Sequence, residues 1–246
     1  MESLRNSRFG KKVSENSTKL FESADYSKIT LSNTYDSYVF NVETSFEELV
    51  KLFRKLQLSI DIIEKLNIDS FMVDEKYNKY EYIIYLLENF IIRLLSIEDR
   101  SLNLINIIFD LGNDDRNCKE HIILKNKNVI DSDVNLSYKK LSKILTMYKE
   151  DRNTIIHHGS YSNDDTFYLE LYNSFLATGN LYSNNDDQVK TLNNFYSAES
   201  REIKDIKVKE FNDVLKKIGE VILEVFNHLE QRYDCHINKL KNYISN

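Results

Sequence analysis

The side chains with the most versatile chemistry lie together between Asp151 and Tyr161. Arg152 precedes His157 by five residues, and Asn153 follows the arginine. Arginine is a permanently charged, planar group that suits phosphate oxygens, and histidine exchanges a proton near neutral pH. The two can cleave a phosphodiester without a metal, because arginine stabilises charge on the phosphorane while histidine moves the proton. RNA supplies its own nucleophile, the 2′-hydroxyl, so neither serine nor cysteine is required.

The R-x4-H spacing of Arg152 and His157, in a chain with helical patterning, resembles the motif of the HEPN superfamily (higher eukaryotes and prokaryotes nucleotide-binding). The resemblance implies a metal-independent endoribonuclease that forms a homodimer, with two motif copies facing one cleft. Arg152 and His157 would then be catalytic and Asn153 supporting. Such families often serve as toxins or in defence against phage, which implies RNA as substrate and an antitoxin or other regulatory partner.

A second match to the same pattern occurs at Arg116 and His121, again with an asparagine after the arginine. We favour Arg152 because its spacer is apolar and follows an amphipathic segment. The spacer after Arg116 instead contains a lysine and a glutamate and follows a predicted helix end at Gly112. Arg116 and His121 remain the alternative pair.

Two further side chains adjoin the motif, namely His158 and Tyr161. A second imidazole or a phenol beside His157 could tune its protonation or contact a base. The alternative is that both side chains pack at the helix end, and the sequence favours neither role.

No metal or cofactor is predicted. Cys118, His121, Cys235 and His236 are potential zinc ligands, but adjacent residues on a helix diverge and do not easily reach one ion. The chain also lacks a glycine-rich phosphate loop and a dinucleotide-binding fingerprint, which argues against nucleoside-triphosphatase and dehydrogenase functions.

Composition predicts a helical cytoplasmic protein. The 246 residues include no proline and five glycines, which favours long helices. The net charge of −6 is not that of a general nucleic-acid binder, so any RNA contact must be local. Two cysteines fit a reducing compartment. The N-terminus lacks the apolar core of a signal peptide, and no run approaches the roughly 18 apolar residues of a membrane span.

Apolar residues at helical spacing predict an all-α domain in residues 45–246. The resemblance implies that these helices form a HEPN-like antiparallel bundle. Ser45 and Glu48 form a capping box that opens the first helix. The predicted helices are 46–63, 75–97, 98–111, one from about Leu136, one over 168–176, and a long closing helix from Glu202 to at least Tyr233.

The remaining segments are predicted to be less regular. Residues 1–44 are polar and suggest a weakly ordered N-terminal arm, with a short strand or extended stretch where Tyr38, Phe40 and Val42 alternate. Residues 113–133 are predicted to be mainly loop. Residues 180–200 indicate a polar insertion or linker.

Two polar stripes have alternative explanations. Asn106 and Asp110, on the predicted 98–111 helix, could help to orient a catalytic histidine, although a solvated face explains them more simply. Lys139, Lys143 and other lysines before the motif could contact RNA phosphates, although a lysine-bearing solvent face is common.

The leading hypothesis is an endoribonuclease. A non-catalytic protein of the same fold, which binds RNA, a nucleotide or another protein, is the alternative. A third hypothesis is a helical scaffold in which Arg152 contacts an acidic partner and His157 is a core residue.

Overall fold

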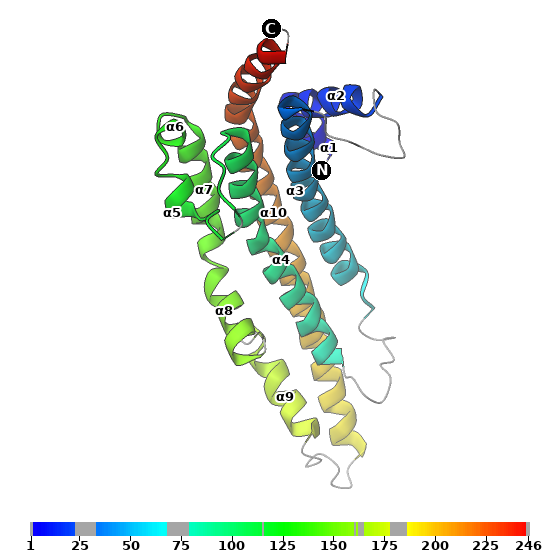
Figure 1. Cartoon of the computed structure of the whole chain (residues 1–246). Coiled ribbons are helices and arrows are strands. Elements are labelled where there is room, and N and C mark those ends of the chain that lie inside the picture. Colours follow the sequence, from blue (N-terminus) through cyan, green and yellow to red (C-terminus); the bar gives the residue numbers. More distant parts are fainter. Residues whose placement is uncertain are drawn as a thin grey trace. The chain divides into compact units, whose positions relative to one another are not determined.

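The structure of the chain is a computed structural model. It describes residues 2–22, 33–67, 79–114, 116–159, 161, 165–177 and 186–244, and all regular structure within them is α-helical (Figure 1). The predicted all-α class is therefore confirmed. None of the helices in these ranges is long and apolar enough to cross a membrane. The helices are α1 (Glu2–Arg5), α2 (Arg8–Glu22), α3 (Thr34–Lys65), α4 (Lys79–Ile108), α5 (Glu120–Ile123), α6 (Lys127–Ile130), α7 (Val134–Thr146), α8 (Lys149–His158), α9 (Phe167–Ala177) and α10 (Asp186–Ile244).

The chain forms two compact units, and each long helix contributes to both. Unit 1 comprises Met1–Arg54, Leu95–Leu145 and Lys216–Asn246. Unit 2 comprises Lys55–Leu94 and Thr146–Leu215. The favoured motif at Arg152 therefore belongs to unit 2, whereas the alternative pair at Arg116 belongs to unit 1.

Helix α3 begins earlier than the capping box predicted. It starts after Asn33, whose side-chain oxygen accepts a hydrogen bond of 2.9 Å from the backbone N–H of Asp36. Ser45, the predicted cap, lies inside the helix and is buried. The stretch suggested as a strand is helical because apolar residues continue at helical spacing upstream of Ser45, where Val39 and Val42 are buried.

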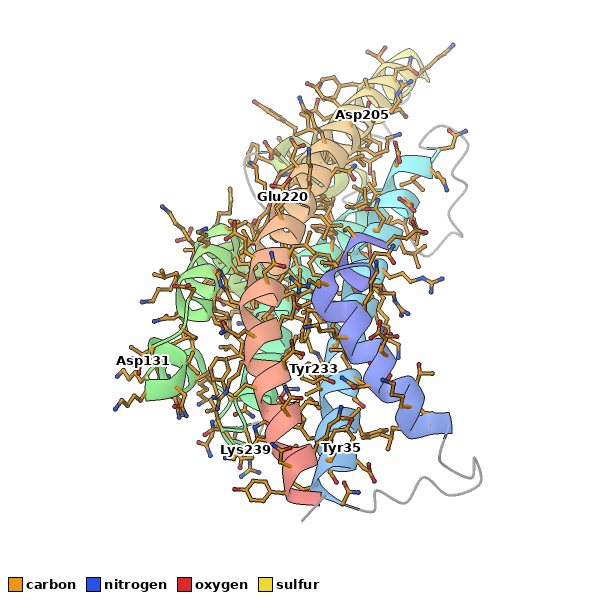
Figure 2. All side chains as sticks on the ribbon, turned by 90° about the horizontal axis from the view of Figure 1, so that it is seen from above. Tyr35, Asp131, Asp205, Glu220, Tyr233 and Lys239 are labelled. Atoms are coloured by element: carbon orange, nitrogen blue, oxygen red, sulfur yellow. The ribbon has the colours of Figure 1, made fainter. Side chains whose placement is uncertain are left out.

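The N-terminal segment is more regular than the predicted arm. Residues 2–22 form α1 and α2, and Phe9 of α2 is fully buried. Its ring lies 5.7 Å from that of Phe46, 5.2 Å from Phe226 and 5.8 Å from Tyr233, between ring centroids. Figure 2 labels Tyr233 on α10 beside these N-terminal helices. A few well-placed apolar residues thus fix a largely polar sequence in the unit 1 core.

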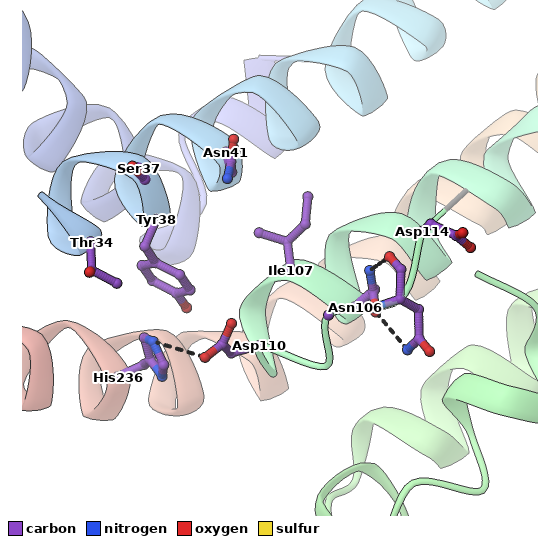
Figure 3. A pocket seen from close by; sticks show the side chains of 11 residues that line it. Thr34, Ser37, Tyr38, Asn41, Asn106, Ile107, Asp110, Asp114 and His236 are labelled. Carbon is purple, nitrogen blue, oxygen red and sulfur yellow. Dashed lines mark hydrogen bonds and ion pairs between the residues drawn. The ribbon is translucent and has the colours of Figure 1, made fainter. Parts of the chain in front are cut away.

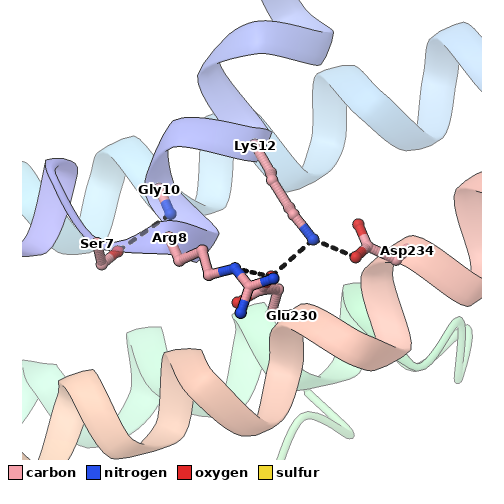
Figure 4. A network of polar contacts seen from close by, with 6 residues as sticks. All are labelled: Ser7, Arg8, Gly10, Lys12, Glu230 and Asp234. Atoms are coloured by element: carbon pink, nitrogen blue, oxygen red, sulfur yellow. Dashed lines mark hydrogen bonds and ion pairs between the residues drawn. The ribbon is translucent and has the colours of Figure 1, made fainter.

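Charged groups also attach α2 to α10 in unit 1 (Figure 4). The ammonium of Lys12 lies 2.6 Å from a carboxylate oxygen of Glu230 and also pairs with Asp234. These two hydrogen bonds raise the pKa of Lys12. Arg8 adds a contact of 3.1 Å to Glu230.

Other boundaries also differ from the predicted ones. The segments 75–97 and 98–111 form one helix, α4, because buried Ile97, Ser101 and Leu102 continue the packed face across the expected break. Helix α10 includes residues 186–200 of the predicted linker, where Tyr196 and Ser200 are buried. Residues 180–185 of that linker lie outside the described ranges. The predicted loop over 113–133 contains the short helices α5 and α6.

The core of unit 2 brings α4 and α10 together. Phe90 of α4 and Phe211 of α10 stack with ring centroids 3.9 Å apart. Leu56 of α3 and Ile91 of α4 are fully buried.

Gly10 should not tolerate a side chain. A Cβ atom at this position would lie 2.7 Å from the carbonyl oxygens of Leu4 and Arg5 and 2.9 Å from the ring of Phe46. Since backbone cannot easily yield, we expect Gly10→Ala to lower the free energy of unfolding by about 1–3 kcal/mol. Urea unfolding followed by circular dichroism measures this change.

Gly219 provides the matched control. A Cβ atom there meets only the ring of Phe53, at 3.9 Å, which is ordinary contact. Because alanine is the better helix former, Gly219→Ala should raise the free energy of unfolding by about 0.5–1 kcal/mol. Equal stability of the Gly10 variant and the wild type would contradict the close packing of α2.

Candidate functional site

The favoured motif lies on a single helix, α8, with one buried and one exposed side. Tyr148, just before the helix, and Ile155 are buried. The helix ends at Gly159, which has a φ of 80° and whose N–H donates to the carbonyl of Ile155 at 3.1 Å. Only glycine adopts this left-handed backbone without strain, so Gly159 stops the helix directly after the motif.

The motif side chains are all exposed on the other side of α8. Asn153 and His157 are four residues apart and share one face, and Arg152 lies beside them. The guanidinium of Arg152 donates to the side-chain oxygen of Asn153 at 3.4 Å. Ile156, four residues after Arg152, is 51% exposed. The arrangement is a solvent-accessible cation next to an imidazole, and the exposure of His157 does not fit the core-residue hypothesis.

Tyr161 fits the packing alternative. It is buried, and its backbone N–H donates to a carboxylate oxygen of Glu88 on α4 at 2.7 Å. Burial raises the pKa of its phenol to about 12. The side chain of His158 lies outside the described part of the structure, although its backbone ends α8.

An ionic network around a buried lysine lies next to α8, and sequence reasoning missed it. Lys207 of α10 is 4% exposed, and its ammonium lies 2.8 Å from carboxylate oxygens of both Asp165 and Glu210. Glu210 also accepts a hydrogen bond of 2.9 Å from the hydroxyl of Tyr148. The ammonium lies 5.9 Å from the centre of the Tyr161 ring. We call these five residues the Lys207 cluster.

The electrostatics of the Lys207 cluster keep its lysine charged. Burial disfavours the ammonium, but the hydrogen bonds to Asp165 and Glu210 outweigh that effect and raise the pKa of Lys207. On α8, burial raises the pKa of Asp151, and the charge of Lys207 opposes this shift. A sequence signal was present: Lys207 lies four residues from both Ile203 and Phe211, within the apolar stripe of α10.

The alternative pair is arranged differently. Arg116 lies in a turn, and His121 lies in the four-residue helix α5. Both side chains are exposed. No single helix therefore holds them in a common register, in contrast to Arg152 and His157.

A separate polar hollow of about 390 Å³ occurs in unit 1 (Figure 3). Tyr38 and Asn41 of α3 line it together with Asp110 and with His236 of α10. The imidazole of His236 lies 3.9 Å from the carboxylate of Asp110, and burial lowers the pKa of His236. No motif residue lines this hollow. Among the described residues, no three histidine, cysteine or acidic side chains cluster so as to hold a metal ion.

The polar stripe of α4 belongs to this hollow. Asn106 is buried, and its amide donates to the carbonyl of Asn113 at 2.9 Å and accepts from the side chain of Asn113 at 2.9 Å. These bonds hold the turn that follows α4. Asp110, in contrast, is exposed. The explanation of the stripe as a solvated helix face therefore holds for Asp110 but not for Asn106.

The bond between Tyr148 and Glu210 should stabilise unit 2. We expect Tyr148→Phe to lower the free energy of unfolding by about 1–2 kcal/mol, because a partly buried carboxylate oxygen loses its donor. Tyr138→Phe is the control, since the buried hydroxyl of Tyr138 has no hydrogen-bond partner within the described ranges. Chemical unfolding of both variants makes the comparison, and equal losses would contradict the role of the bond.

Comparison with known protein families agrees with the all-helical fold. A sequence model of the Cthe2314-like HEPN family matches residues 3–230, a range that includes α8 and most of both units. No curated protein and no solved structure matches the chain. HEPN domains are all-helical, often bind RNA and dimerise, and are often ribonucleases. The chain belongs to the HEPN superfamily, within the Cthe2314-like HEPN family.

Proposed function

We propose that this protein is a metal-independent endoribonuclease whose active site lies on the exposed side of α8. The observation that supports this function is the joint exposure of Arg152 and His157 on one short helix whose opposite side is buried. Asn153 supports the site by accepting a hydrogen bond from Arg152. The same arrangement would be unusual for two residues that merely fill a core.

The chemistry follows from the side chains. A histidine takes the proton of the RNA 2′-hydroxyl, whose oxygen then bonds to the adjacent phosphorus. The bond from phosphorus to the 5′-oxygen breaks, and that oxygen receives a proton. The products are a 2′,3′-cyclic phosphate and a 5′-hydroxyl. Arg152 binds the non-bridging oxygens, whose negative charge increases in the transition state.

A homodimer would complete the site. The reaction requires a general base and a general acid. In one protomer, the motif on α8 contributes His157 for one of these two roles. Twofold symmetry would place a second Arg152 and His157 in the same cleft. The exposed Ile156, between Arg152 and His157, offers an apolar contact for such a dimer interface, which we call the seam.

The charge of the chain limits how RNA binds. With a net charge of −6, the protein must rely on local cations. Lys139 and Lys143 of α7 are exposed, whereas Lys140 pairs with Glu224 at 2.7 Å. The proposed setting is the cytoplasm, with the enzyme acting as a toxin or phage-defence effector under the control of an antitoxin or other regulatory partner.

The same negative charge favours one alternative function, a non-catalytic HEPN protein. In that case Arg152 would bind a phosphate of RNA or of a nucleotide without cleavage. The cleavage experiment below distinguishes the two functions, because a binding protein retains RNA without producing new ends.

Cleavage of RNA in EDTA by purified variants tests the catalytic assignment. We expect wild type to cleave and to leave 2′,3′-cyclic phosphate ends, and Arg152→Ala and His157→Ala each to lose at least about 100-fold in rate. His121→Ala should cleave normally, because the alternative pair does not share one helix. Loss of activity in His121→Ala alone would move the site to Arg116 and His121.

Analytical ultracentrifugation, which gives the mass of the protein in solution, tests whether two chains associate through the seam. Wild type should sediment at twice its chain mass of 29.1 kDa, and Ile156→Asp should sediment as a monomer because a charge would be buried in the interface. Ile130→Asp is the control, since Ile130 of α6 is equally exposed, at 51%, but lies far from the motif in sequence. Dissociation by both variants, or by neither, would contradict a seam at α8.

A further inference from the structure

One buried cation is connected to the chain on both sides of the motif helix. Through Glu210, Lys207 is linked to Tyr148, the residue directly before α8. Through Asp165, it is linked to the segment between α8 and α9. Glu210 and Lys207 both belong to α10, three residues apart, and Tyr148 bonds to α10 through that carboxylate. Asp165 attaches to α10 through the ammonium itself.

The contacts fix this ammonium closely. Lys207 is 4% exposed, and a buried ammonium is costly unless oxygen acceptors surround it. Asp165 and Glu210 supply such acceptors at 2.8 Å each, and the ring of Tyr161 lies beside the charge. A neutral side chain at position 207 would remove the ion pair between Asp165 and α10. It would also remove the charge that fixes the Glu210 carboxylate, which accepts from Tyr148.

Helix α8 is short enough to depend on such attachments. It has ten residues, and isolated helices below roughly 12–15 residues are marginal in water. Its buried side is small, with Ile155 as its buried apolar side chain. After the helix, the backbone N–H of Tyr161 donates to Glu88, a second attachment beside the Lys207 cluster.

From these contacts we infer that Lys207 is a positioning residue for the candidate active site. The lysine does not touch RNA, because it is buried. It pairs with Asp165 after α8 and fixes the Glu210 carboxylate that binds Tyr148 before α8, so that Arg152 and His157 keep their place on the exposed side. This inference rests on the proposed endoribonuclease function as far as catalysis is concerned. The fixing of α8 by the Lys207 cluster is independent of that function.

Three variants test the role of Lys207. Lys207→Met keeps the shape and removes the charge, and Lys207→Arg keeps the charge. Leu56→Ala weakens the unit 2 core at a fully buried apolar residue outside the Lys207 cluster. Two measurements apply to each variant: kcat and KM for RNA cleavage in EDTA, and amide hydrogen exchange of α8 compared with that of α4. The second needs no catalysis.

We expect Lys207→Met to lower kcat about 10- to 100-fold with KM changed less than about threefold, since misplaced catalytic groups mainly affect the reacting state. Exchange in α8 should accelerate more than exchange in α4. Lys207→Arg should recover most of both properties. Leu56→Ala should accelerate exchange in both helices alike and keep kcat.

The outcomes distinguish a failure of the proposed ribonuclease function from a failure of the positioning role of Lys207. If wild type cleaves no RNA, the proposed function fails, and exchange in α8 alone then decides whether Lys207 positions the helix. Unchanged α8 exchange in Lys207→Met would overturn the inference, as would equal effects of Lys207→Met and Leu56→Ala on α8 and on kcat. Faster amide exchange in α8 than in α4 for Lys207→Met, with wild-type exchange restored in Lys207→Arg, would support the inference.

Discussion

Because a ten-residue helix has little stability of its own, the position of α8 depends on what its buried side contacts. The Lys207 cluster lies at the flanks of this helix, with Tyr148 directly before it and Tyr161 after it. Its buried ammonium is costly without acceptors, and the partly exposed Asp165 and Glu210 supply them. The stacked pair Phe90 and Phe211 places α10 against α4 and so supports the same arrangement in unit 2.

The candidate site lies on the solvent-exposed side of α8, away from the Lys207 cluster and the core of unit 2. The side of α8 that meets solvent remains available for Arg152, Asn153 and His157, none of which is needed for packing. Substitution of these residues should therefore affect activity much more than stability. Membership of the HEPN superfamily gives this surface a context in which RNA is a common ligand.

Regular patterns were predictable from the sequence, and long-range polar contacts were not. Apolar spacing correctly indicated an all-α chain. Gly112, predicted as a helix end, has the positive φ of 68° that favours glycine, although α4 already ends at Ile108. Local signals failed where tertiary packing overrode them. Ser45 resembled a cap but is buried within α3, because apolar residues before it continue the helix.

The candidate site was predictable to the same limited extent. The spacing of Arg152 and His157 suffices to propose a pair, since it needs only one helix. The Lys207 cluster needs residues from positions 148 to 210 to meet, and one sequence does not show which lysine within an apolar stripe finds acidic partners. Arg116 and His121 match the same spacing, and their separation into a turn and a short helix became visible only in three dimensions.

The most direct test of the central claim, 2′-hydroxyl attack at the α8 site, uses two RNA oligonucleotides that differ by one atom. Wild-type protein in EDTA is given an RNA cleaved at a mapped position and the same RNA with a single 2′-deoxy nucleotide immediately 5′ of that bond. We predict cleavage of the first and none of the second at that bond, because the nucleophile is missing. Equal cleavage of both would contradict the account, since water or another group would then be the nucleophile.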